Sequence, residues 1–169
     1  MASLLTSGVR VDCLGACLKN GEYPSGVSTL ETVSRYRYMI CIENSAYPSF
    51  VTERVFNAWI GGTIPIYRGA PDIADYAPSP RSYILVDDFE DAHALAQYLF
   101  YLDGNQTARS EYLAFKDPSF PLAKGFLDAS AESMYAPGGE AGSADPFPAA
   151  PLMRDLADPA LMSFNDERW

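Results

Sequence analysis

Basic residues, long apolar runs and a secretion signal are scarce or missing in this sequence of 169 residues. It carries 12 Lys and Arg against 22 Asp and Glu, a net charge of −10. That balance excludes a general nucleic-acid binder, which needs a basic face to displace counterions from phosphates. The apolar runs Tyr38–Ile42 and Ala92–Leu102 fall well short of the ~20 residues of a spanning helix. The first residues also lack the basic region of a signal peptide, so we predict neither a membrane span nor a leader in this chain.

Cysteine and histidine are too few, and wrongly spaced, for a disulfide framework or a zinc site. There are three cysteines, Cys13, Cys17 and Cys41, without a C-x-x-C pair, and His93 is the one histidine. A disulfide framework needs an even number, and a structural zinc site needs clustered ligands. Cys13 and Cys17 are either a redox pair or two incidental small apolar residues, and we read His93 as a surface residue. We therefore predict neither a disulfide framework nor a zinc site.

The hydrophobic pattern predicts an α/β fold with a mainly parallel sheet, because strands alternate with helices along the chain. A proline inside the second predicted strand favours an end or an edge position. The acidic cluster Asp87–Asp91 is read as the start of a helix, since acids complement the helix dipole there, with a metal site as the alternative. The predicted strands are Tyr36–Ile42, Thr63–Tyr67 and Ser82–Val86, and the predicted helices are Phe50–Ile60, Asp87–Leu102 and Asn105–Phe115.

The charge and the amino-acid composition of the chain change toward its carboxyl end. Residues 87–169 carry five basic and fifteen acidic side chains, so the whole net charge lies in that half. From Gly138 the sequence GGEAGSADPFPAAP is acidic and rich in glycine and proline, with little apolar surface to bury. We predict a folded domain over residues 1–126 and a disordered, low-complexity tail over 127–169.

The strongest candidate site lies where the first predicted strand gives way to the following helix. Ligands of open α/β sheets bind beyond the carboxyl ends of strands, and a helix N-terminus offers amides and positive charge to a phosphate. Arg54 next to that positive end is unfavourable unless an anion lies between them, and Glu53 could accept hydrogen bonds from ribose hydroxyls. The alternative is a surface helix capped by Ser49 with an ordinary Glu–Arg pair. The candidate residues are Glu43, Asn44, Phe50, Val51, Thr52, Glu53 and Arg54.

Six blocks in this part of the chain resemble the α1,3-fucosyltransferase family in order and in spacing. The similarity runs from about Val9 to Lys116, and the GAP and APSP blocks look most like the plant-type core α1,3 enzymes that act on N-glycans. The blocks are YRYMICIENS at 36–45, FVTER at 50–54, NA at 57–58, GTIPI at 62–66, GAPDI at 69–73 and YAPSPRS at 76–82.

The resemblance implies a Rossmann-like parallel sheet that forms the carboxyl-terminal, GDP-fucose-binding half of a GT-B glycosyltransferase, incomplete at its N-terminus. By position, Glu53 would hold the ribose, and Glu43 and Asn44 would line the fucose side. Arg54 stands where the family has a lysine on the diphosphate, which keeps the charge but is not a neutral exchange. Phe50 stands where the family has a tyrosine, and so lacks its hydroxyl.

The same resemblance implies a reaction and a location. Fucose would pass from GDP-fucose, with inversion and without a metal ion or other cofactor, to a GlcNAc hydroxyl of a glycoprotein glycan in the Golgi. The family takes its catalytic base from an amino-terminal acceptor domain, which we do not find here, so no catalytic residue is assigned. We expect the chain alone to be soluble, to bind the donor weakly at most and not to transfer fucose. The C-x-x-C found near the family's carboxyl end is also missing.

Two other functions stay open from the sequence. The chain could be a non-catalytic module that binds a nucleotide sugar or a protein partner, or a receiver-type regulatory domain. A receiver needs a lysine at a strand end beyond its acidic cluster, and none follows Asp87 and Asp88 in such a place. Separately, Asn105-Gln-Thr107 is an N-glycosylation sequon, although Asn105 could equally cap a helix.

Overall fold

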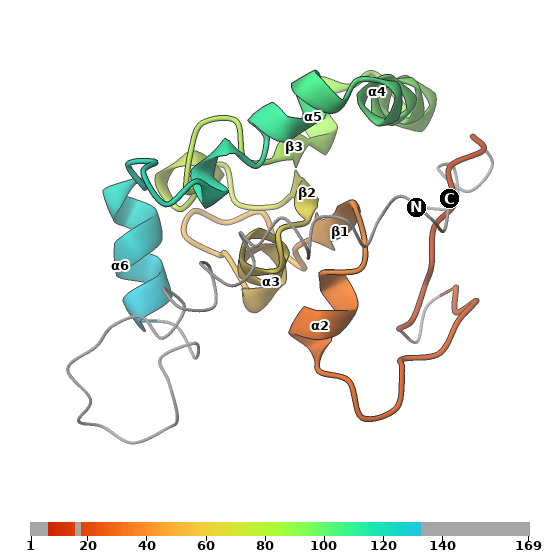
Figure 1. The fold of residues 1–169 in the computed structure, drawn as a ribbon, viewed down its shortest axis with the longest axis horizontal. Helices are drawn as coiled ribbons and strands as arrows, with labels where there is room; N and C mark the ends of the chain where they lie inside the picture. The colour runs from red at the N-terminus through yellow and green to blue at the C-terminus, as the bar shows by residue number, and fades with distance from the viewer. Residues whose placement is uncertain (1–6, 16–17, 133–169) are drawn as a thin grey trace.

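The computed structural model describes residues 7–15 and 18–132, which form an α/β fold (Figure 1). In the labels below, η marks a 3-10 helix. The elements, in chain order, are α2 (Thr29–Val33), β1 (Tyr38–Ile42), α3 (Glu53–Gly61), β2 (Ile64–Arg68), η1 (Ile73–Asp75), β3 (Ile84–Leu85), η2 (Val86–Asp88), α4 (Ala92–Gly104), α5 (Gln106–Glu111), η3 (Ala114–Lys116) and α6 (Lys124–Glu132).

The three strands form a parallel sheet in the order β1-β2-β3, which confirms the predicted fold class. Successive residues of β2 point to opposite faces of the sheet. Ile64 and Ile66 pack in one core cluster with the apolar side of α4, while Tyr67 packs in another with α3. The sheet therefore lies between α3 on one face and α4 on the other, as Figure 1 shows.

Of the two positions predicted for the proline, an edge strand is wrong, because β2 is the central strand, whereas Pro65 does lie near an end of that strand as its second residue. Pro65 is nevertheless tolerated there. It pairs with Met39 of β1, whereas β3 pairs only with Ile66 and Tyr67. At Pro65 the strand thus has a neighbour on one side, which is the local environment of an edge position.

The helix that follows β1 begins three residues later than predicted, and Ser49 is not its cap. The backbone of Ser49 has φ +62°, and its N–H donates to both carboxylate oxygens of Asp72 at 2.9 Å. Helix α3 begins at Glu53, with Thr52 as its N-cap residue. The loop therefore bends toward Asp72 before the helix starts, which the sequence pattern alone did not indicate.

The acidic cluster before α4 acts as a helix start, as predicted, although the helix begins only at Ala92. Asp91 is the N-cap, and its carboxylate accepts the N–H of Ala94 at 2.8 Å. The next predicted helix is shorter than expected and is split into α5 and η3. The ring of His93 lies on the surface side of α4, and its Nε2 is 3.0 Å from Nε2 of Gln97.

The core beside α3 is aromatic and includes a residue of α6, the last described helix. Trp59 is fully buried and lies edge-on to Phe56 and Phe126, with ring centroids 5.5 and 5.8 Å away. Its indole N–H donates to the carbonyl of Ser82 at 2.9 Å. Phe126 belongs to α6, so the boundary predicted after residue 126 falls inside a helix. The rest of the predicted tail, from residue 133 onward, lies outside the described residues.

Gly62 ends α3 in a conformation that disfavours a side chain. Its φ is +71°, and a Cβ there would collide with Nζ of Lys116. Gly62→Ala should therefore lower the free energy of unfolding by about 1–2 kcal/mol, the cost of a left-handed non-glycine residue, as measured by urea denaturation. Gly104→Ala is the matched control, because Gly104 ends α4 without a positive φ and a Cβ there would meet no atom within 4 Å. Equal midpoints for the two variants would contradict this account.

Candidate donor-binding site

The candidate site lies at the carboxyl edge of the sheet, where β1 ends and the loop to α3 begins. The N–H of Glu43 donates to the carbonyl of Arg68 at 2.9 Å, so the pairing of β1 with β2 continues one residue past the strand. This contact fixes the backbone of Glu43 and directs the chain that follows over the edge of the sheet.

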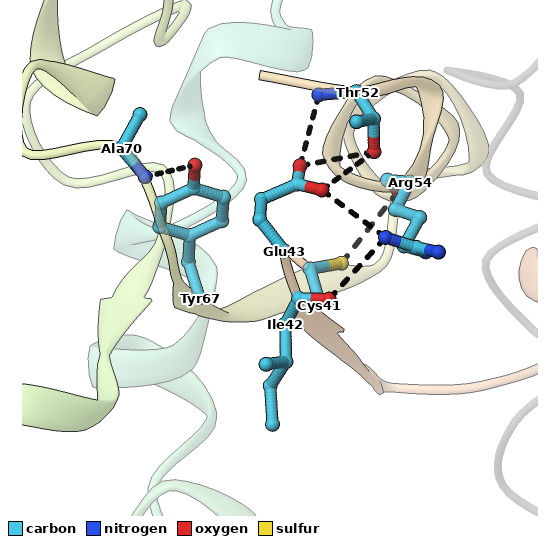
Figure 2. Close-up of polar contacts among 7 residues, drawn as sticks. All are labelled: Cys41, Ile42, Glu43, Thr52, Arg54, Tyr67 and Ala70. Carbon is cyan, nitrogen blue, oxygen red and sulfur yellow. Dashed lines mark hydrogen bonds and ion pairs between the residues drawn. The ribbon is translucent and has the colours of Figure 1, made fainter. Parts of the chain in front are cut away.

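Glu43 is a buried carboxylate whose oxygens bind the start of α3. Its side chain is 0% exposed. One carboxylate oxygen accepts the N–H of Thr52 at 2.9 Å, and the Thr52 hydroxyl lies 3.0 and 2.8 Å from the two oxygens. The second oxygen accepts Nη1 of Arg54 at 3.1 Å. Figure 2 shows the carboxylate pointing between these two residues. A buried carboxylate is tolerated only when it is paired in this way.

Arg54 is held at the first turn of α3 by two contacts from the same nitrogen. Nη1 donates to Glu43 at 3.1 Å and to the carbonyl of Ile42 at 3.4 Å. Its side chain is 37% exposed, so solvent reaches the guanidinium. Glu43 therefore offsets part of the predicted conflict between this cation and the positive end of the helix.

The first turn of α3 has no side-chain cap. The first N–H groups of a helix lack intrahelical acceptors, and an N-cap threonine commonly supplies one. Here the hydroxyl of Thr52 is engaged by Glu43 and makes no cap bond. The amide of Thr52 is also taken by Glu43, and Val55 is fully buried. The surface of the helix start that faces solvent is therefore formed by Glu53 and Arg54.

The structure brings some of the predicted residues together and leaves others along the loop surface. Glu43, Thr52 and Arg54 form one network, whereas Asn44, Phe50 and Glu53 are exposed and Val51 is half-buried. Phe50 is 39% exposed, and its N–H donates to the carbonyl of Tyr47 at 3.2 Å.

Two supports of the site, Tyr67 near the end of β2 and Gly69 just beyond it, were not predicted from the sequence. The hydroxyl of Tyr67 accepts the N–H of Ala70 at 3.0 Å, and burial raises the pKa of Tyr67 to about 12. A Cβ on Gly69 would lie 2.5 Å from Cγ of Glu43 and 2.7 Å from the Tyr67 hydroxyl. Gly69 therefore leaves the space that Glu43 occupies. The GAPDI block contained the signal, since a glycine at a strand end often marks a close approach.

A second guanidinium lies at the same edge of the sheet. Arg68 ends β2 and pairs with Asp87, which follows β3, with Nε and Oδ1 3.0 Å apart. Both side chains are more than half exposed, so the pair is weak and solvent-screened. Sequence analysis did not select Arg68, although its place after a buried strand was the available signal. The guanidinium groups of Arg54 and Arg68 thus both lie at the carboxyl edge of the sheet, and each is paired with one carboxylate.

The other features of the described residues do not form a competing chemical centre. Among residues 7–15 and 18–132, no three His, Cys, Asp or Glu side chains gather as a metal site. Cys41 is buried with Sγ 3.6 Å from the carbonyl of Arg54, and burial raises its pKa. Cys17 lies outside the described residues, so the pairing with Cys13 stays untested.

The helices of the described part are all too short or too polar to cross a membrane. A cleft of about 370 Å³ lies along β3, lined by Arg81, Tyr83 and Phe89 among others. It contains none of the predicted donor residues.

Comparison with known proteins gives one family. The model for the carboxyl-terminal region of glycosyltransferase family 10 (fucosyltransferase) matches residues 1–131. An α-(1,3)-fucosyltransferase B of Drosophila melanogaster is 36% identical over 123 residues, 66% of this chain and 28% of the fly protein. A GDP-fucose protein O-fucosyltransferase 3 of Bos taurus is 31% identical over 121 residues, 66% of this chain and 25% of the bovine protein.

A solved structure gives the same result for the fold. The crystal structure of an α1,3-fucosyltransferase with GDP-fucose aligns with a TM-score of 0.58 and 28% identity, over 66% of this chain and 32% of that one. The chain thus spans about a quarter to a third of the length of these proteins. Its fold is that of a carboxyl-terminal GT-B half, as predicted.

Removing the carboxylate of Glu43 should loosen the start of α3. Glu43→Ala leaves three donor contacts without their acceptor, and we expect the free energy of unfolding to fall by about 2–3 kcal/mol. Asp87→Ala is the control, since it removes the exposed partner of Arg68 at the same edge and should change stability by less than about 0.5 kcal/mol. Urea denaturation of both variants measures the difference. A loss for Glu43→Ala no larger than for Asp87→Ala would show that the buried carboxylate does not hold the helix.

Proposed function

Because the chain belongs to glycosyltransferase family 10, the fucosyltransferases, we propose that it is the donor-binding part of an enzyme that transfers fucose from GDP-fucose. The donor would lie beyond the carboxyl ends of β1 and β2, against the start of α3. The acceptor would be a GlcNAc hydroxyl of a glycoprotein glycan, the product an α1,3 linkage, and the location the Golgi.

The observation that carries this proposal is the position of Arg54. It is 37% exposed, it lies in the first turn of a helix, and that helix starts beyond the carboxyl end of a parallel strand. A diphosphate placed there would meet the guanidinium and the positive end of the helix together. A guanidinium can also donate hydrogen bonds to two phosphate oxygens at once, while Nη1 keeps its contact with Glu43.

The other predicted residues take roles that fit their exposure. We propose that Glu53 binds the ribose hydroxyls, because its side chain is exposed at the helix start. Asn44 and Phe50 are exposed on the loop and would border the donor, with Val51 and Thr52 forming the backbone between them and the helix. Glu43 would act on the fucose side chiefly by positioning Thr52 and Arg54, because its carboxylate is buried in contact with both.

These groups would stabilise the charge that develops during transfer. The acceptor oxygen attacks the anomeric carbon from the face opposite the phosphate, the carbon–oxygen bond to GDP breaks, and the electron pair leaves with GDP. A base removes the acceptor proton. One preorganised donor to the leaving phosphate supplies about 3 kcal/mol, and with Arg54 and the helix start in place we propose that no metal ion is needed.

The base and the acceptor contacts are assigned to a domain beyond this chain. The resemblance places the base in an acceptor domain, and we propose that residues 1–169 alone do not transfer fucose. One relative is named as a protein O-fucosyltransferase, so a protein hydroxyl is a second candidate acceptor. A non-catalytic nucleotide-sugar-binding module is the remaining alternative, and it shares the same donor site.

Binding of GDP tests the site directly. We expect GDP to raise the thermal unfolding midpoint of residues 1–169 and Arg54→Ala to weaken the affinity about ten- to a hundredfold, the loss of one charge-assisted contact. Arg54→Lys should keep most of the affinity, and Glu53→Ala should reduce it through the ribose.

Each midpoint is compared with that of the same variant without GDP, because Arg54→Ala also removes the pair with Glu43. Arg35→Ala is the matched control, since Arg35 is exposed and follows α2 on another part of the surface. A full response to GDP in Arg54→Ala, or the same loss in Arg35→Ala, would overturn the proposed site.

A further inference from the structure

The turn between α4 and α5 carries a modification sequence that the donor site does not use. Asn105-Gln106-Thr107 is the one N-x-[ST] sequon in the chain, and such sequons accept glycans on surface segments. Gln106 and Thr107 are exposed, and Asn105 is half-buried. The turn is therefore on the surface, as a modification site requires.

The oxygen and the nitrogen of the Asn105 side-chain amide make different hydrogen bonds. Its carbonyl oxygen accepts the N–H of Ala108 at 3.0 Å and so caps α5. Its amide nitrogen donates to the hydroxyl of Tyr101 at 3.1 Å, in an exposed position. Glycosylation replaces one of the two hydrogens on this nitrogen and leaves the carbonyl oxygen unchanged. The cap of α5 and the modification are thus compatible.

Tyr101 offers an aromatic surface beside the same nitrogen. Its side chain is 53% exposed, and its ring packs against that of Tyr98 with the centroids 6.0 Å apart and the planes tilted by 30°. The ring is thus supported by a neighbour and still open to solvent. A sugar on Nδ2 would emerge next to this ring, and the C–H groups of a pyranose can pack on an aromatic face, which is negative at its centre.

We propose that Asn105 is N-glycosylated and that the first GlcNAc of the glycan packs on the ring of Tyr101. The reaction takes a lipid-linked oligosaccharyl diphosphate. The amide nitrogen attacks the anomeric carbon of the GlcNAc, the bond from that carbon to the phosphate oxygen breaks, the lipid diphosphate leaves with the electron pair, and the nitrogen loses one proton. This inference rests on the proposed function in one respect, namely that the chain enters the secretory pathway.

The glycan would not obstruct the donor site. Asp103, two residues before Asn105, accepts the Tyr38 hydroxyl at 3.2 Å and Nη1 of Arg37 at 3.3 Å. Arg37 and Tyr38 are at the amino end of β1. The sequon therefore lies by the amino edge of the sheet, whereas the donor site lies at the carboxyl edge.

Secretion of the full chain tests whether the site is occupied. Residues 1–169 are expressed behind a cleavable leader in yeast, and the secreted protein is compared before and after peptide N-glycosidase F. We expect a mobility shift of one glycan that is absent in Thr107→Ala and kept in Thr107→Ser. Thr107→Ala is a clean control because the capping residue Asn105 remains. A secreted wild-type chain with an unmodified Asn105 would overturn the proposal.

Trimming the glycan tests the contact with Tyr101. Endoglycosidase H leaves a single GlcNAc, whereas peptide N-glycosidase F removes it and converts the asparagine to an aspartate, a residue that still caps a helix. We expect the single-GlcNAc form to unfold roughly 2–4 °C higher than the deglycosylated form, and this difference to vanish in Tyr101→Ala. An equal difference in Tyr101→Ala would overturn the packing claim. GDP binding is measured on the same samples. A chain that does not bind GDP is thereby distinguished from one that lacks the contact between the glycan and Tyr101.

Discussion

The architecture of the site depends on one buried carboxylate placed between a strand and a helix. Glu43 is fixed by the sheet through its N–H and binds the start of α3 through its side chain. Burying a carboxylate is costly unless several donors surround it, so the position of Glu43 dictates where Thr52 and Arg54 must lie. Gly69 contributes by leaving the space that the side chain needs. The loop of residues 44–51 can then follow the edge of the sheet without disturbing the helix start.

This arrangement explains how an acidic protein can present cationic groups to an anion. Arg54 and Arg68 each lie beside a carboxylate, but the two pairs differ in burial. Glu43 is inaccessible, whereas Asp87 is 65% exposed. The first pair therefore holds its guanidinium in one position, and the second lets its guanidinium move in solvent. A fixed cation at a helix start is the element that preorganised stabilisation of a leaving phosphate requires.

The sequence predicted the fold class and the location of the candidate site better than it predicted their details. The apolar sequence of Tyr38–Ile42 and the apolar face of α3 formed a clear pattern from which the parallel sheet was predicted, although Cys41 is the one buried residue of that strand. The start of α3 was misplaced because Asp72, 23 residues beyond Ser49, bends the loop, and such long-range contacts leave no local signal. The central position of the strand that holds Pro65 was missed because a proline usually marks an edge strand. Here the short β3 does not reach Pro65, so one side of this residue stays unpaired even in a central strand. That Glu43 turns inward could not be known without the contacts of Thr52 and Arg54.

The most direct test of the account is a titration of ¹⁵N-labelled residues 1–169 with GDP, followed by the backbone amide and arginine Nε resonances in NMR spectra. The account predicts that the largest shifts occur at the amides of Glu53 and Arg54 and at Nε of Arg54. Shifts confined to the cleft along β3, at Tyr83 and Phe89, would contradict it.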